Sequence, residues 1–131
     1  IAFNGPNYPY LIPFRYIRSN DFLYFHFTEY GKKMKLMERD NKVCVQIESY
    51  KPDLSQYNFV SIRGTLERVD DLNEYNEAIA LLRETGKESS PKFLAAHGID
   101  PSKGWDEFNE EKDLVIVKLV DIVEKVGLKE P

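Results

Sequence analysis

A chain of 131 residues and 15.3 kDa has the size of one domain, and it can bury a core without disulfides or metals. Its 42% hydrophobic and 31% charged content is typical of a soluble globular protein, and its net charge of −4 excludes the basic surface that non-specific nucleic-acid binding needs. No run approaches the roughly 20 apolar residues of a membrane span. The single cysteine, Cys44, cannot form an internal disulfide, so a cytoplasmic location is expected.

Aromatic residues are frequent, with eight tyrosines, eight phenylalanines and one tryptophan. They favour a β-rich core and leave rings to line a pocket. We expect 1–131 to be a single domain. The chain begins at Ile1, within a strand-like pattern, so we expect that a preceding segment is missing.

The first long apolar segment, Tyr10–Ile17, predicts a strand. Pro13 inside it marks either an edge strand or a place where a ligand replaces the strand-to-strand hydrogen bonds. A tight turn at 19–21 leads into a second strand, Phe22–Thr28, so the two strands are predicted to form a hairpin. One face of the second strand carries Tyr24, His26 and Thr28, and the other carries Leu23, Phe25 and Phe27.

Gly31 interrupts the strand pattern, and a short helix is predicted over Lys32–Arg39. Alternation then predicts a strand at Val43–Ser49, and a long strand is predicted at Phe59–Val69. Gly64, in the middle of the long strand, indicates a bulge or a close approach of another backbone.

The period changes to helical after Asp71, which with Glu74 forms a capping pair. The helix is predicted to end at Gly86, and a second short helix is predicted from Pro91 to Gly98. A polar loop follows over 99–112.

A nearly continuous β-branched run at Leu114–Val120 predicts a buried strand, and 124–131 is predicted to be a tail. The predicted elements follow in the order strands, short helix, strands, helices, strand. This order indicates a small antiparallel barrel with helices at its ends.

The adjacent lysines Lys32 and Lys33 stand where the strand gives way to the helix. Unpaired N–H groups and the dipole at a helix N-terminus attract anions, so two cations there are consistent with a phosphate site. The alternative is a solvated basic helix, because Lys35, Arg39 and Lys42 continue the run.

Other candidates are single residues. Arg15 lies among aromatics and needs either a partner or a path to solvent. His26, between two phenylalanines, is either structural or a proton carrier.

Two histidines 71 positions apart and one cysteine give no metal-ligand spacing, so no metal site is predicted. Cys44 is expected to be a packed, small apolar residue.

Together these blocks resemble the pyridoxamine-phosphate-oxidase-like family of FMN-binding split barrels, and within it the branch of nitroimidazole-resistance reductases. The blocks that carry the resemblance are YPYLIPFRY at 8–16, LYFH at 23–26, GKK at 31–33, NKVCV at 41–45 and VSIRG at 60–64 followed by Glu67. The resemblance implies a mainly β fold, a six-stranded antiparallel split β-barrel with peripheral helices. It also implies a homodimer with FMN at the subunit interface.

The resemblance assigns roles by position. It places Pro13, Phe14, Arg15 and Tyr16 along the isoalloxazine ring, and it places His26, Phe27 and Thr28 at the ribityl and phosphate end. Lys32 and Lys33 match the pair of cations that holds the phosphate. Phe59 stands where the oxidase itself has a glutamine, so the resemblance does not extend to oxidation of pyridoxamine phosphate.

The expected activity is that of a flavin-dependent oxidoreductase acting on a small planar molecule, with His26 as the candidate catalytic residue. Two alternatives stay open from the sequence. One is a flavin-binding or storage module without a substrate of its own. The other is the same barrel holding haem or a deazaflavin.

Overall fold

The computed structural model describes residues 1–86, 102 and 114–129. Its elements are, in chain order, β1 (Ala2–Phe3), β2 (Tyr10–Leu11), β3 (Tyr16–Ser19), β4 (Phe22–Thr28), α1 (Lys32–Arg39), β5 (Lys42–Tyr50), β6 (Tyr57–Arg68), α2 (Leu72–Gly86) and β7 (Leu114–Lys129). The strands form one sheet in the order β2-β1-β5-β6-β7-β4-β3. This mainly β arrangement confirms the predicted fold class and is consistent with a split barrel.

The predicted count of six strands is wrong, because the described residues contain seven. The run Tyr10–Ile17 divides into β2 and β3, and residues 12–15 between them lie outside the sheet. Pro13 explains the interruption, since proline has no N–H to donate and a fixed φ. The two resulting strands lie at the two ends of the strand order, as the edge interpretation of Pro13 predicts.

The chain folds as two compact units, which interleave along the sequence. The first unit takes in Ile1–Phe14, Tyr30–Glu67 and the chain from Lys118 onward. The second unit takes in Arg15–Glu29 and the described residues between Arg68 and Val117. Strand β7 begins in the second unit and continues into the first.

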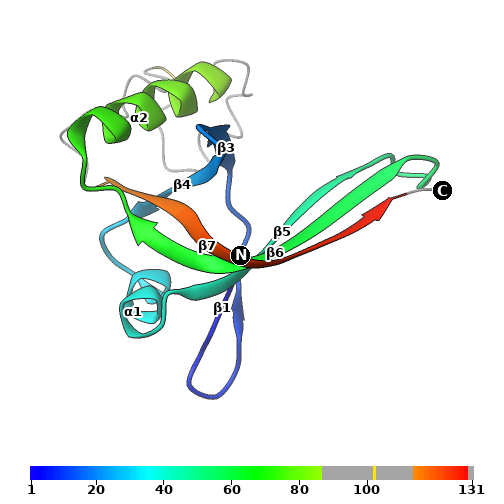
Figure 1. Ribbon diagram of the computed structural model, residues 1–131, viewed down its shortest axis with the longest axis horizontal. Coiled ribbons are helices and arrows are strands. Elements are labelled where there is room, and N and C mark those ends of the chain that lie inside the picture. The colour runs from blue at the N-terminus through cyan, green and yellow to red at the C-terminus, as the bar shows by residue number, and fades with distance from the viewer. Residues whose placement is uncertain (87–101, 103–113, 130–131) are drawn as a thin grey trace. The chain divides into compact units, whose positions relative to one another are not determined.

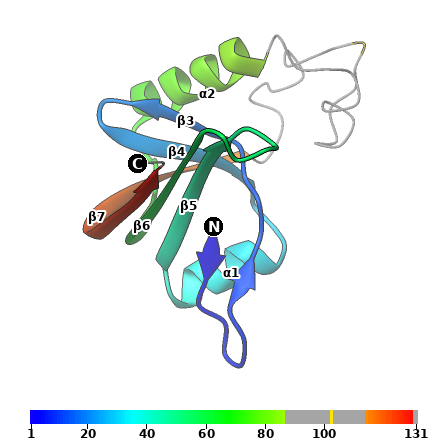
Figure 2. The ribbon, with the colours of Figure 1, turned by 90° about the vertical axis from the view of Figure 1, so that its right-hand side faces the viewer.

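In the first unit, β1 pairs antiparallel with both β2 and β5, and β5 pairs antiparallel with β6. Figure 1 shows the β5–β6 hairpin running beside the far part of β7, and Figure 2 shows α1 beside β1. The core residues of this unit are large and apolar, among them Phe3, Val43, Val45, Leu66 and Leu119. Alternate residues of β5 and β6 face this core, and in β5 this is the pattern that predicted the strand.

Helix α1 has the bounds that the sequence predicts. It buries Met34 and Leu36 and ends at Asp40, whose N–H donates to the Leu36 carbonyl at 2.8 Å. The Asp40 carboxylate also accepts a hydrogen bond from Asn4 Nδ2 at 3.0 Å, which connects the end of α1 to the turn after β1.

In the second unit, β3 and β4 form the predicted hairpin, with Ser19 opposite Phe22. The two turn residues, Asn20 and Asp21, both have positive φ, 49° and 64°. Such a pair is the signature of a two-residue type I′ turn, whose twist matches that of the flanking strands. The Ser-Asn-Asp sequence thus sets the register of this hairpin.

Helix α2 begins as predicted, because Asp71 Oδ1 accepts a hydrogen bond from the N–H of Glu74 at 2.8 Å. Its apolar face enters a core cluster made of Ile17, Tyr24, Val69, Ala78, Ile79, Leu82 and Ile116. The predicted helix over 91–98 lies outside the described residues, as does the loop over 99–112 apart from Ser102. No helix in the described part of the chain has the length and apolarity to cross a membrane.

The prediction of a tail over 124–131 is wrong for its described part, because β7 continues to Lys129. The nine residues from Asp121 are all exposed, so no burial pattern marks them in the sequence. The prediction for Gly64 is confirmed: a Cβ there would lie 2.7 Å from the carbonyl oxygen of Val120. Asp121, the next residue, has a φ of 48°.

Candidate functional site

The backbone at the N-terminus of a helix such as α1 favours an anion. Its N-cap is Gly31, with φ 99° and ψ 178°, a conformation essentially restricted to glycine. Gly31 has no side chain to cap the first turn, and that turn contains no acidic residue. The positive end of the helix dipole is therefore not compensated from within α1.

Both predicted phosphate ligands lie at this end of the helix. Lys33 is half-buried, and its Nζ lies 3.9 Å from the position that a Cβ on Gly31 would take. Burial lowers the pKa of the Lys33 ammonium group. Lys32 is exposed, with its Nζ 4.6 Å from the centroid of the Tyr10 ring. Two positively charged ammonium groups are unfavourable at the positive end of the helix dipole. A bound dianion would offset that unfavourable interaction.

Three aromatic rings of the first unit lie near one another, and Lys32 lies beside one of them. The fully buried Phe3 ring lies 6.2 Å from the Tyr10 ring and 6.4 Å from the Phe14 ring, measured between centroids. Pro13 is exposed beside Phe14. The first unit thus brings Lys32 close to one ring of this cluster, and four of the nine predicted site residues, Pro13, Phe14, Lys32 and Lys33, belong to this unit.

The second unit holds the other five predicted residues. Arg15 is half-buried, its Nη2 donates a hydrogen bond to Thr85 Oγ1 in the last turn of α2, and burial lowers its pKa. Tyr16 is 41% exposed and its ring lies 6.5 Å from that of Phe25, the residue opposite it in β4. The Arg15 guanidinium therefore has a neutral hydrogen-bond partner in α2.

The remaining three residues follow one another at the end of β4. His26 and Thr28 are half-buried on one face of the strand, and Phe27 on the other face is 1% exposed. Because the Phe27 side chain is buried, only its main chain is left to contact a ligand. Three residues, Glu29 to Gly31, connect Thr28 to the start of α1.

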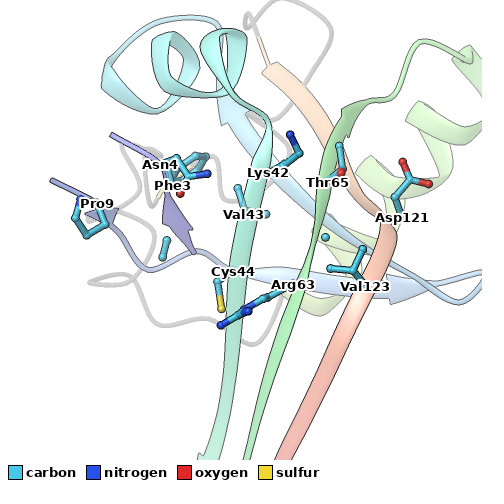
Figure 3. A pocket seen from close by; sticks show the side chains of 12 residues that line it. Phe3, Asn4, Pro9, Lys42, Val43, Cys44, Arg63, Thr65, Asp121 and Val123 are labelled. Carbon is cyan, nitrogen blue, oxygen red and sulfur yellow. The ribbon is translucent and has the colours of Figure 1, made fainter. Parts of the chain in front are cut away.

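The first unit also contains a cavity of about 460 Å³, shown in Figure 3. Strand register explains its floor, because Ala2 lies opposite Cys44 and Cys44 lies opposite Arg63. The side chains of Ala2 and Cys44 are short, and Gly64, next to Arg63, has none, so a hollow is left between longer side chains. Its polar lining residues are Asn4, Lys42, Cys44, Arg63, Thr65 and Asp121.

This cavity was not predicted from the sequence, and Cys44 was expected to be a packed residue. The thiol instead lines the hollow, half-buried, with Sγ 3.2 Å from the Ser61 hydroxyl. Arg63 is exposed and forms an ion pair with Glu124 at 3.2 Å. The sequence did contain a signal for this cavity. Lys42 and Cys44 occupy alternate positions of one strand, and Arg63 and Thr65 occupy alternate positions of the strand paired with it, so these polar residues share one face. The described residues contain no group of three or more His, Cys, Asp or Glu side chains suited to a metal ion.

Solved structures resemble the chain over nearly its whole length. A FAD-binding protein from Mesorhizobium loti superposes with a TM-score of 0.62 at 21% identity, covering 99% of this chain and 83% of that one. A protein provisionally assigned to 5-nitroimidazole antibiotic resistance, from Bacteroides thetaiotaomicron, gives 0.60 at 19%, covering 96% and 72%. The FAD binding protein from Mycobacterium smegmatis gives 0.61 at 14%, covering 99% and 83%. At these identities the likeness establishes the fold.

No curated protein matches the sequence significantly. A family profile described as pyridoxamine 5'-phosphate oxidase matches residues 1–117, which is most of the chain. The resemblance in the sequence blocks, the fold and this match agree. The chain belongs to the pyridoxamine 5'-phosphate oxidase family.

Proposed function

We propose that this protein binds FMN and that Lys32 and Lys33 hold the phosphate at the N-terminus of α1. The observation that carries the proposal is the uncapped helix start at Gly31, with two lysines and no acidic residue in the first turn. A phosphate monoester near neutral pH carries a charge of about −1.5 to −2 and three acceptor oxygens, which suits two ammonium groups and helix N–H donors.

The phosphate chemistry also favours FMN over FAD. FMN ends in a monoester dianion, whereas the two phosphates of FAD are internal and carry one charge each. The similar structures named as FAD-binding proteins support a flavin in general. The two lysines at one helix end support the more highly charged terminal phosphate.

The isoalloxazine ring is proposed to lie along Pro13, Phe14, Arg15 and Tyr16. Residues 12–15 form no strand, and Pro13 and Tyr16 are exposed, so this segment offers surface to a flat ligand. His26 and Thr28, on one face of β4, are proposed to meet the ribityl chain and phosphate end. Phe27 would contribute its main chain there.

We propose further that the protein is a homodimer with the flavin between subunits, and an oxidoreductase acting on a small planar molecule. The bound flavin would supply the redox chemistry. This chain's residues would anchor the phosphate, orient the ring and exclude water. An imidazole can donate or accept a proton near neutral pH, so His26 is the candidate for proton transfer to the substrate. Family membership supports the flavin. The dimer and the roles of these residues follow from the resemblance of the sequence blocks.

Titration of the flavin-free protein with FMN, riboflavin and FAD tests the cofactor. Riboflavin has the same ring and ribityl chain but no phosphate. We expect FMN to bind at least about tenfold more tightly than riboflavin, because charge-assisted hydrogen bonds to phosphate exist only in that complex. Equal affinities would overturn the phosphate assignment.

Two further measurements test assembly and activity. Sedimentation at micromolar concentration should give a dimer, and a monomer that still binds FMN would contradict the interface site. Reduced nicotinamide nucleotide should bleach the FMN absorbance, and a nitroaromatic acceptor should restore it with turnover. FMN that binds but is never reduced would indicate a binding module rather than an oxidoreductase.

A further inference from the structure

Arg15 connects the segment between β2 and β3 to Thr85 in α2, which lies 70 residues further along the chain. Its Nη2 donates a hydrogen bond to Thr85 Oγ1 in the last turn of α2. Both residues belong to the second unit. Helix α2 thereby touches a residue that is proposed to lie along the flavin ring.

The Thr85 hydroxyl is oriented to accept this hydrogen bond. It donates its one proton to the carbonyl oxygen of Leu81, one turn earlier, at 2.9 Å, with the Leu82 carbonyl at 3.4 Å. A hydroxyl has one proton and two lone pairs, so a proton fixed on the helix backbone leaves a lone pair for the guanidinium.

The geometry of Arg15 suits a positioned cation. A guanidinium is planar with five N–H donors, so fixing one nitrogen restricts the orientation of the whole plane. The carbonyl end of α2 favours a positive charge, which stabilises the same arrangement. Arg15 is also half-buried, so its side chain has lost part of its rotamer freedom.

We propose that Thr85 is a positioning residue, which holds the Arg15 guanidinium in the orientation that the flavin requires. This inference rests on the proposed function, in which Arg15 contacts the ring. It gives the last turn of α2 a role in ligand binding in addition to its role in the core.

Thr85→Val tests the proposal, because valine keeps the shape and removes the acceptor. We expect FMN affinity to fall about tenfold or more, as for the loss of a hydrogen bond to a charged group. Thr85→Ser retains the hydroxyl and should restore most of the affinity. Asn76→Val places the same β-branched residue at an exposed position of α2 and should bind FMN like the natural protein.

A double-mutant cycle separates positioning from a structural role. Arg15→Met should weaken FMN binding and shift the flavin absorbance bands, and Thr85→Val should shift them in the same direction. Adding Thr85→Val to Arg15→Met should then cost little more, because both changes remove one coupled element. Circular dichroism confirms that each variant is folded.

Failure of the positioning role and failure of the proposed function give different results. The positioning role would be overturned, with FMN binding intact, if Thr85→Val kept the FMN affinity and spectrum of the natural protein. It would also be overturned if the losses of FMN affinity in Thr85→Val and Arg15→Met added fully in the double variant. A natural protein that binds no flavin would overturn the proposed function and the positioning role together.

Discussion

The phenol of Tyr24 donates a 2.8 Å hydrogen bond to Oε1 of Glu74, which connects β4 to the first turn of α2. Tyr24 is 2% exposed and belongs to the core cluster of the second unit. Burial, together with the hydrogen bond to Glu74 and the charges of Glu74 and Glu77, raises the pKa of Tyr24 to about 12. The bond therefore exists only while the phenol keeps its proton.

The Tyr24 hydrogen bond predicts a loss of stability at alkaline pH. The unfolded chain has the ordinary tyrosine pKa of about 10, so the protonated phenol stabilises the fold fully below that pH. As the pH rises from about 10 to about 12, a contribution of about 2–3 kcal/mol should disappear. Urea unfolding of the natural protein and of Tyr24→Phe at pH 8 to 12 measures it. Tyr24→Phe should have the flatter profile, and identical profiles would contradict the assignment.

Gly64 should not tolerate even a methyl group. A Cβ there would lie 2.7 Å from the Val120 carbonyl oxygen and 3.1 Å from Leu119 Cδ1, so β7 would have to shift. Gly64→Ala should lower the free energy of unfolding by about 1–3 kcal/mol. Gly127→Ala, in β7, is the matched control, because a Cβ there would meet no atom within 4 Å, and it should change the free energy of unfolding by less than about 0.5 kcal/mol. Equal effects would show that the contact is not responsible.

Replacing Gly31 should lower both the stability of the fold and the affinity for FMN. Its φ of 99° and ψ of 178° disfavour any side chain, so Gly31→Ala should cost about 1–3 kcal/mol of unfolding free energy. The change also disturbs the first turn that is proposed to hold the phosphate. FMN affinity should therefore fall more than riboflavin affinity. An unchanged affinity for FMN in a folded Gly31→Ala variant would place the phosphate elsewhere.

Local signals in the sequence were sufficient for much of the fold. Helix α1 was predictable to the residue because Gly31 stops the strand and Met34, Leu36 and Met37 follow at helical spacing. The β3–β4 hairpin followed from the Asn20-Asp21 turn, and Gly64 was recognisable as a close approach. Each of these features depends on residues that are neighbours in the chain.

Features that depend on distant residues could not be predicted. The far part of β7 is exposed, so its pairing with β6 leaves no burial pattern in the sequence. The hydrogen bond from Arg15 to Thr85 joins residues 70 positions apart, and nothing near either residue indicates the other. The cavity beside Cys44 arises from short side chains on three paired strands, a coincidence that only the register reveals.

The affinity of Lys33→Ala for FMN and for riboflavin tests the central claim most directly, with Lys35→Ala in the same helix as the matched control. We predict that Lys33→Ala binds FMN about tenfold or more weakly while its affinity for riboflavin is unchanged, because only FMN carries the charge that Lys33 neutralises. Lys35→Ala should bind both ligands like the natural protein. An unchanged affinity of Lys33→Ala for FMN, or an equal loss for both ligands, would contradict a phosphate site at the start of α1.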